Sequence, residues 1–319
     1  MLAKLAERRE KLNNNRKIRY IKRNYDLYYL LIPALVFVFI FNYLPLVGIG
    51  MAFVDYNIMA GNNPIQAIFV SDFVGLQHFI NLFNNPDVIQ VIINTLRISI
   101  LKIIIIFPLP IILALLLNEV RLILYKRVLQ TVLYLPRFLS WAVVSGIFTT
   151  LLSSTGAVNI AIQGMGGETI MFLIDRFWWQ FTVIFTDAWK EVGWGSIIYL
   201  AAITSVDPSL YEAAMLDGAG RFKQTIYITL PSIMPTIVLL LILRVSGIME
   251  AGFEQIFILI NPVVRDVGEI IGIYVWRMGL GRLNFSMGSA FGLINSVIAF
   301  SLVISCNGFA KKFMGRSIW

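Results

Sequence analysis

Residues 27–53 read LYYLLIPALVFVFIFNYLPLVGIGMAF and contain no Asp, Glu, Lys or Arg. A helix needs about 20 apolar residues to cross the roughly 30 Å of hydrocarbon in a bilayer, and this stretch is longer. It also exceeds the roughly 7–15 apolar residues of a secretory signal core. We therefore expect a retained membrane-spanning helix here and not a cleaved leader.

Five further apolar stretches follow, at about residues 98–117 (with a helical lead-in from Val88), 128–152, 181–203, 226–248 and 287–309. Hydrophobic residues make up 58% of the chain and charged residues 14%, against roughly 45–50% and 25% in soluble domains. No stretch alternates as barrel strands do, so we predict an all-α membrane protein with six transmembrane helices. The simplest division is a basic tail over 1–26, a transmembrane domain over 27–310 and a short basic tail over 311–319.

The positive charges indicate the orientation of these helices. The net charge is +8, and 17 of the 26 Lys and Arg residues lie in the N-terminal tail, in segments 118–127 and 204–225, and after residue 309. Cytoplasmic loops are enriched in Lys and Arg, so both termini are predicted to be cytoplasmic, with outer loops at about 54–90, 153–180 and 249–286. This placement favours a topology signal over a nucleic-acid-binding arm, and no nucleic acid is expected as a partner.

Several kinds of chemistry are excluded by composition. The single cysteine, Cys306, and the single histidine, His78, cannot form an internal disulfide or a Cys/His metal cluster. The chain also contains no Gly-Lys pair, and so no P-loop for ATP. We expect no catalytic residue, metal or cofactor in this chain.

One polar segment between the fourth and fifth apolar stretches is unusual. Residues 207–231 read DPSLYEAAMLDGAGRFKQTIYITLP. Asp207 suits a helix N-cap and Pro208 its first position, whereas Gly218 and Gly220 favour a turn after the helix. The pattern predicts a short helix, a glycine turn and a second short stretch outside the membrane.

The short helix is predicted to present a slim apolar face to a partner. Tyr211 and Met215 stand four residues apart, and Ala213 and Ala214 between them are small. An amphipathic helix of this kind fits a groove on another protein. Glu212 is able to add a charge-assisted hydrogen bond to an Arg of that partner.

This segment resembles the EAA loop of ABC importer permeases. The match is Glu212-Ala213-Ala214, three residues, Gly218, nine residues, then Ile228-Thr229-Leu230-Pro231. Asn94-Thr95-Leu96, Tyr134-Leu135-Pro136 and the segment 189–202 are also similar to carbohydrate permeases of the maltose-type class. The similarity is greatest to the subgroup for complex oligosaccharides and covers nearly the whole chain after the basic tail. Relative to the larger maltose permease subunit, the chain lacks extra N-terminal spans and a large periplasmic insert.

The resemblance implies a type I ABC importer permease fold and a set of partners. In that family, two permease subunits form the pathway and two ATP-binding cassette subunits bind ATP and Mg²⁺. An extracellular or periplasmic binding protein delivers the sugar to the permease subunits, which lie in the bacterial cytoplasmic membrane. The resemblance implies that six residues couple this chain to the ATPases: Tyr211, Glu212, Ala213, Ala214, Met215 and Gly218. The second permease is expected to be a related protein, and a second copy of this chain is the alternative. The alternative function is a carrier driven by an ion gradient. Such carriers usually show repeated halves and midplane ion sites, and the sequence shows neither.

Ionisable residues inside predicted spans are the default candidates for the substrate pathway. The fourth stretch holds Asp187, Lys190 and Glu191, and sugars bind against aromatic faces beside polar groups. The predicted pathway residues are Trp189, Lys190, Glu191, Trp194, Asn94, Tyr199 and Asn295. The alternative is that Lys190 pairs with Glu191 and that the tryptophans form an interfacial belt.

Three further positive charges within or near the predicted spans do not determine whether the substrate is neutral or acidic. Lys102, Arg137 and Arg244 are suited to passing an acidic sugar, or to snorkelling, or to pairing with carboxylates such as Glu250 or Glu119. Three charges in the third outer loop, Arg265, Asp266 and Glu269, are suited either to docking a binding protein or to a solvated loop.

Overall fold

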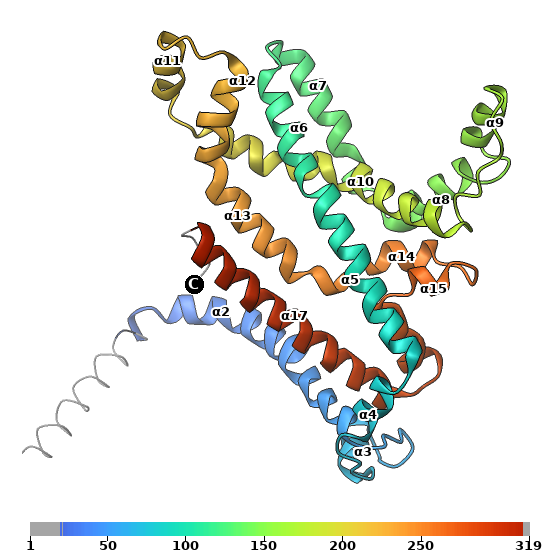
Figure 1. Cartoon of the computed structure of the whole chain (residues 1–319). Coiled ribbons are helices and arrows are strands. Elements are labelled where there is room, and N and C mark those ends of the chain that lie inside the picture. Colours follow the sequence, from blue (N-terminus) through green and yellow to red (C-terminus); the bar gives the residue numbers. More distant parts are fainter. Residues whose placement is uncertain (1–19, 21, 315–319) are drawn as a thin grey trace, which may run out of the picture. The chain divides into compact units, whose positions relative to one another are not determined.

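The computed structural model describes residues 20 and 22–314, and all regular elements within them are helical (Figure 1). One isolated antiparallel bridge joins Val54 and Phe73. The all-α prediction is therefore confirmed for the described part of the chain. Most of the predicted N-terminal basic tail, and Arg316 near the other end, lie outside the described residues.

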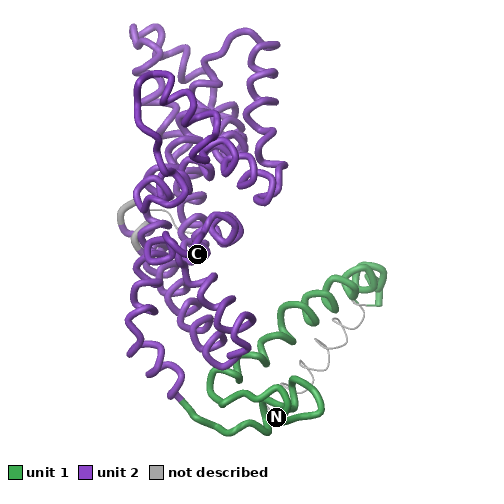
Figure 2. The backbone as a smooth tube through the Cα atoms, turned by 90° about the vertical axis from the view of Figure 1, so that its right-hand side faces the viewer, with its two compact units in different colours: residues 1–75 green, residues 76–319 purple. Residues whose placement is uncertain are grey.

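The chain divides into two compact units, residues 1–75 and 76–319, coloured green and purple in Figure 2. In the first unit, helix α2 (Tyr25–Val38) continues through a π-helical turn, η1 (Phe39–Tyr43), into the 3-10 helix η2 (Leu44–Phe53). No residue of α2 is buried, as expected of a helix whose apolar surface is made for lipid. The short helix α3 (Pro64–Val70) follows, with Asn63 as its N-cap.

The second unit begins with α4 (Gln77–Phe83) and the long pair α5 (Pro86–Ile106) and α6 (Pro108–Glu119). Phe107 keeps helical dihedrals between α5 and α6, so the two form one rod. The predicted lead-in to the second span is confirmed, since α5 begins at Pro86 with Asn85 as its cap.

The predicted third span is broken in the structure. Helix α7 (Ile123–Tyr134) ends in a 3-10 turn, η3 (Leu135–Phe138), and α8 (Trp141–Leu151) leaves at an angle of 102°. Proline at position 136 and the Ser140 cap of α8 explain the break, because Pro removes a backbone donor and a capping side chain starts a new helix. The apolar stretch predicted over 128–152 is therefore helical but bent, as in a broken span or a re-entrant loop. Helix α9 (Ala157–Gly164) lies in the loop that follows.

Helix α10 (Arg176–Thr204) is 29 residues long and lies against α5, α6, α7, η3 and α13. Figure 1 shows it crossing the α5–α6 rod. Buried apolar side chains on either side of its midpoint form two cores, one around Trp179 and Val183 and the other around Tyr199 and Ile203. The helix therefore organises the packing of the second unit.

The remaining chain starts with α11 (Pro208–Leu216). Next, α12 (Arg221–Gln224) runs through the π-helical turn η4 (Thr225–Thr229) into α13 (Leu230–Ser246). After the 3-10 turn η5 (Ile248–Glu250) come α14 (Phe253–Leu259), α15 (Arg265–Gly268), α16 (Ile271–Trp276) and the π-helical turn η6 (Arg277–Gly281). Helix α17 (Phe285–Met314) follows.

Four helical stretches are long and apolar enough to cross a membrane, and a fifth qualifies if the bent pair counts as one span. The four are Tyr25–Phe53, Pro86–Glu119, Arg221–Ser246 and Phe285–Gly308. Helix α10 is not among them, because Asp187, Lys190 and Glu191 fall within any 18-residue stretch of it. Each of the six predicted stretches nevertheless coincides with a helix or helix pair.

The segment 249–286, predicted as an outer loop, is folded into short helices that are largely packed against the other helices. It contains α14, α15 and α16, and its Ile256, Ile270 and Ile271 side chains have no exposed surface. Short apolar runs separated by Gly, Asn and Pro conceal such packed helices from a search for long spans.

Contacts group the inter-helix segments at two opposite ends of the α5–α6 rod. At the α6 end, Arg221 of α12 pairs with Glu119. At the α5 end, Asn94 donates to the Asp266 carbonyl at 2.8 Å. Arg176 pairs there with Asp266 at 2.8 Å, and Asn261 donates to the Leu173 carbonyl at 2.7 Å. The segments around 119 and 221 thus lie together, away from the segments around 173 and 266.

Candidate functional site

A polar cavity of about 310 Å³ lies where the helix breaks meet the middle of α5 and α10. This volume is at the lower end of the range for small-molecule sites, about 300–1,000 Å³. Its walls come from α5, α10, the η3–α8 break and the end of α13 with the turn that follows. The lining residues are Ser99, Lys102, Ile103, Arg137, Trp141, Asp187, Glu191, Leu243, Arg244, Gly247, Ile248, Glu250, Ala251 and Gly252.

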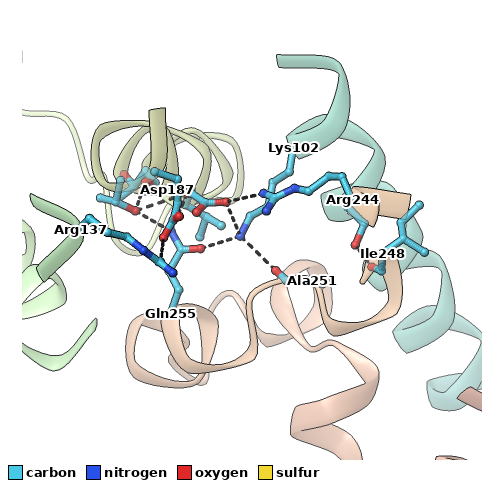
Figure 3. Close-up of polar contacts among 12 residues, drawn as sticks. Lys102, Arg137, Asp187, Arg244, Ile248, Ala251 and Gln255 are labelled. Atoms are coloured by element: carbon cyan, nitrogen blue, oxygen red, sulfur yellow. Dashed lines mark hydrogen bonds and ion pairs between the residues drawn. The ribbon is translucent and has the colours of Figure 1, made fainter. Parts of the chain in front are cut away.

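A buried ion pair forms the floor of this cavity (Figure 3). The Lys102 Nζ lies 3.1 Å from Asp187 Oδ2, and the two side chains are 5% and 7% exposed. Lys102 also donates to Gln255 Oε1 at 2.6 Å and to the Ala251 carbonyl at 3.0 Å. All three ammonium protons are thereby used, as a buried charge requires.

Gln255 extends this network to α10. Its amide nitrogen donates to the Val183 carbonyl at 2.6 Å and to Thr186 Oγ1 at 2.7 Å. Ser99 of α5 donates to the Ile248 carbonyl. Side chains on the unbroken helices therefore satisfy backbone carbonyls freed where α13 ends, which is the condition for irregular backbone at membrane depth.

Two arginines lie at the cavity wall. Arg137 pairs with Glu191 at 2.5 Å. Arg244, in the last turn of α13, approaches Asp187 only to 3.8 Å and is 44% exposed. The alternative that these cations pair with carboxylates is confirmed, but the partners are Asp187 and Glu191 and not Glu250 or Glu119. Glu119 pairs with Arg221.

Two of the predicted pathway residues donate hydrogen bonds to backbone carbonyls and do not line the cavity. Lys190 is buried and donates to the Leu139 carbonyl at 2.6 Å, with its amine 4.6 Å from the centre of the Trp141 ring. Asn94 is fully buried and donates to the carbonyls of Asp266 and Glu269. The alternative of a Lys190–Glu191 pair is wrong, since each has another partner.

The predicted aromatic residues are also placed outside the cavity wall. Trp189 packs edge-on against Phe148 and Trp194 against Phe138, with ring centres 5.4 and 5.7 Å apart. Tyr199 is buried in the core near Ala114 and Ile233. Asn295 lies on α17, where its buried amide oxygen has no hydrogen-bond partner among the described residues. Of the predicted pathway residues, Glu191 is the one that the structure places in the cavity wall.

Trp141 is the aromatic residue of the cavity wall, and it was not predicted. It opens α8 directly after the helix break. A signal existed in the Leu-Pro-Arg-Phe-Leu-Ser sequence before it, where a proline and a capping serine mark a helix end and a new start. The sequence alone did not show that this break would face Asp187 and Lys102.

The loop over 207–231 adopts the predicted local structure. Asp207 caps α11 by accepting from the Ser209 backbone N–H at 2.9 Å, and this bond lowers the pKa of the Asp207 carboxyl below its ordinary value. The Tyr211 hydroxyl lies 2.9 Å from Thr229 Oγ1, so Tyr211 ties α11 back to η4. Glu212, Ala213 and Met215 are exposed, and Ala214 is half-buried.

Several apolar side chains on this loop are exposed. Leu216 is 91% exposed, and Met215, Phe222 and Tyr227 are also exposed. A shallow groove beside them is lined by Leu210, Ala213, Ala214, Asp217, Tyr227, Ile228, Pro231 and Ser232. An exposed apolar patch of this kind marks an interaction surface.

Gly218 ends α11 in the left-handed conformation, with φ of 72°, while the Ala219 N–H reaches back to the Ala214 carbonyl at 2.8 Å. We expect Gly218→Ala to destabilise this turn by about 1 kcal/mol, because a Cβ strains a positive φ. Gly220→Ala is the control, since Gly220 has φ of −69° and open space around its Cβ position. Amide hydrogen exchange of residues 208–220 should rise in the first variant alone, and equal exchange in both would contradict this reading.

No group of three or more His, Cys, Asp or Glu side chains suited to a metal ion occurs within residues 20 and 22–314. The site therefore consists of a charged cavity and, at the α6 end of the rod, an exposed helical loop.

Comparisons with known proteins agree with this architecture. Residues 106–313 match the family described as binding-protein-dependent transport system inner membrane component. The chain is 43% identical over 303 residues to the polygalacturonan/rhamnogalacturonan transport system permease protein YteP of Bacillus subtilis (strain 168), covering 95% of this chain and 92% of that protein.

Two solved structures are similar over nearly the whole chain. One is of a bacterial ABC transporter involved in the import of the acidic polysaccharide alginate, with a TM-score of 0.85, 38% identity and coverage of 93% of this chain and 99% of that one. The other is of an alginate ABC transporter in complex with an alginate pentasaccharide-bound periplasmic protein, with a TM-score of 0.86, 38% identity and coverage of 94% and 99%. The family match and the apolar helices identify a multi-pass membrane protein. The chain belongs to the family of binding-protein-dependent transport system inner membrane components.

Proposed function

We propose that this chain is the membrane-spanning, non-catalytic subunit of an ATP-driven importer of oligosaccharides in the bacterial cytoplasmic membrane. Its family and the names of its relatives support a sugar substrate. A second permease subunit completes the pathway, two ATPase subunits bind ATP and Mg²⁺, and a periplasmic or extracellular binding protein delivers the sugar. The alginate transporter bound to a periplasmic protein supports the last of these partners.

Six spans and two cytoplasmic termini are the topology that fits this role. Helix α10 completes the six, because its charged residues face partners inside the bundle and not lipid. The basic segments around 119 and 221 gather at one end of the α5–α6 rod and the segments around 173 and 266 at the other. This grouping supports the sidedness that the positive-inside rule predicts.

The loop over 207–231 is the observation that carries the proposal. A short, capped helix projects Met215 and Leu216 outward, while Tyr211 anchors it to η4 at the start of the α13 span. Movement of a partner docked on α11 would thus be passed directly to a transmembrane helix. Glu212, Ala213, Ala214, Met215 and Gly218 form the contact and its turn, and Tyr211 provides the anchor.

The cavity supplies part of the pathway in this proposal. It lies at mid-length of α5 and α10 and is bordered by helix breaks at residues 139–140 and 247–252. Broken helices around a midplane polar site are a recurrent arrangement in transporters. Glu191 and Trp141 are the wall residues suited to sugar hydroxyls and sugar faces respectively.

Neutralising Glu212 tests the coupling directly. Glu212 makes no hydrogen bond or ion pair with another described residue, so Glu212→Gln should leave the fold of this chain unchanged. Loss of one charge-assisted hydrogen bond to an ATPase subunit, about 1.5–3 kcal/mol, should lower ATP-dependent uptake by about 10- to 100-fold. Uptake is measured in proteoliposomes that contain the assembled importer and its loaded binding protein.

Glu168→Gln is the matched control, because Glu168 is an exposed carboxylate outside this loop and its groove. We expect it to keep uptake within about twofold of the unmodified importer, as surface substitutions usually do. Equal uptake by the Glu212 and Glu168 variants would show that α11 does not transmit the effect of ATP through Glu212.

A further inference from the structure

We propose that Arg244 is the residue that recognises a carboxylate of an acidic saccharide in the cavity, while Lys102 and Asp187 form the fixed floor beneath it. This inference rests on the proposed function, since it assumes that the cavity belongs to the sugar pathway. It adds the chemical class of the ligand and the side chain that selects it.

The two cations near Asp187, Lys102 and Arg244, differ in how many close polar contacts they make. Lys102 lies 3.1 Å from Asp187 Oδ2 and is held by two further hydrogen bonds in a nearly water-free position. Arg244 reaches the same oxygen only at 3.8 Å, beyond hydrogen-bond distance, and donates no hydrogen bond to a described residue. Because Lys102 already neutralises Asp187, the guanidinium of Arg244 has donors and charge to spare.

The other charged residues of the cavity wall determine which ligand Arg244 is able to bind. Arg137 and Glu191 form a close pair, so they cancel each other. Glu250 also lines the cavity, is exposed and forms no ion pair with a described residue. Arg244, which pairs with Asp187 only at 3.8 Å, and Glu250, which forms no ion pair with a described residue, are therefore the most weakly paired cation and anion of the cavity wall.

A uronic acid unit matches this pair, because it carries one carboxylate and several hydroxyl groups on the same ring. The planar guanidinium of Arg244 binds a carboxylate through two parallel hydrogen bonds. Glu250 accepts hydrogen bonds from hydroxyls, and Trp141 offers an apolar wall. A neutral sugar would leave Arg244 without an anion, so the cavity should discriminate by charge as well as by shape.

Direct binding to the assembled importer tests this proposal. Trigalacturonate and its neutral methyl ester, which differ only at the carboxylates, are titrated by calorimetry into the complete complex in lipid nanodiscs, without binding protein. We expect the unmodified complex to bind the acid about 10- to 100-fold more tightly than the ester, the effect of one charged hydrogen-bond pair. Arg244→Gln should reduce this ratio to near one, and Arg244→Lys should restore part of it.

Arg282→Gln is the control, since Arg282 is exposed and lies outside the cavity wall; it should keep the full preference for the acid. Stimulation of ATPase activity by the loaded binding protein is measured in parallel, and Arg282→Gln should retain it. A preference unchanged in Arg244→Gln, a complex that binds neither sugar, or equal losses for acid and ester would overturn the role of Arg244. If stimulated ATPase activity and uptake persist in any of these cases, the proposed importer function still stands.

Discussion

Replacing Asp187 by Asn should destabilise the second unit by about 3–5 kcal/mol, the usual cost of leaving one charge of a buried pair without its partner. Lys102 would lose the carboxylate that is paired with its buried amine. A buried ammonium without this partner favours rearrangement, so the hydrogen bonds from Lys102 to Ala251 and Gln255 should weaken and the cavity floor should loosen. The midpoint of thermal unfolding in detergent, measured on the purified protein, reports the loss.

Two comparisons separate this effect from a general sensitivity to charge removal. The double change Lys102→Met with Asp187→Leu removes both buried charges and should recover most of the stability. Glu191→Gln breaks the partly exposed Arg137 pair and should cost no more than about 1 kcal/mol. A loss from Asp187→Asn no larger than that from Glu191→Gln would show that the buried pair is not a structural element.

Replacing Gly193 by Ala should have an effect of similar size for a steric reason. A Cβ at residue 193 would lie 1.9 Å from the carbonyl oxygen of Leu133, so α10 and α7 would have to separate. The Leu133 carbonyl oxygen is a backbone atom, and a Cβ is fixed directly to the backbone, so neither atom can rotate away. Overpacking usually costs about 1–3 kcal/mol, and a clash with backbone should reach or exceed the upper value. The yield of folded, monodisperse protein and its unfolding midpoint both measure it.

Gly146→Ala is the matched control, because the Cβ position of this helical glycine has no atom within 4 Å. It should be neutral or slightly stabilising, as Ala is favoured over Gly within a helix by about 0.5–1 kcal/mol. If Gly193→Ala were tolerated as well as Gly146→Ala, the close crossing of α10 over α7 would be incorrect.

Local features of this fold could be predicted from sequence because their causes are local. The helix over 208–216 follows from a capping aspartate, a first-turn proline and a glycine with positive φ, all within twelve residues. The uncharged run of 27–53 likewise requires no information from the rest of the chain. The α5 start at Pro86 follows from its Asn85 cap.

Features that depend on distant partners could not be predicted in this way. Lys190 and Asn94 were predicted to line the substrate pathway, but both are buried and donate to the backbone carbonyls of Leu139 and Asp266. Those carbonyls are available only because the chain breaks near residue 139 and folds back over 249–286. Whether a buried polar side chain binds substrate or supports backbone is decided by such breaks, which hydropathy does not reveal.

The aromatic residue of the cavity wall is Trp141, whereas Trp189 and Trp194 were predicted to line the pathway. Of these three tryptophans, Trp141 is the one that lines the polar cavity. Trp189 and Trp194 stand close to Glu191 in sequence, but the helical twist of α10 turns them toward Phe148 and Phe138. Sequence proximity to a charge is therefore a poor guide to a shared face.

Isolation from native membranes tests most directly whether this chain works as one subunit of an ATP-driven importer. The affinity-tagged chain is purified in mild detergent, its partners are identified by mass spectrometry, and uptake is assayed after reconstitution with and without ATP. We predict a complex with a second permease and two ATPase subunits, whose uptake of oligosaccharide requires both ATP and a loaded binding protein. A chain that purifies alone and transports sugar without ATP would contradict the account.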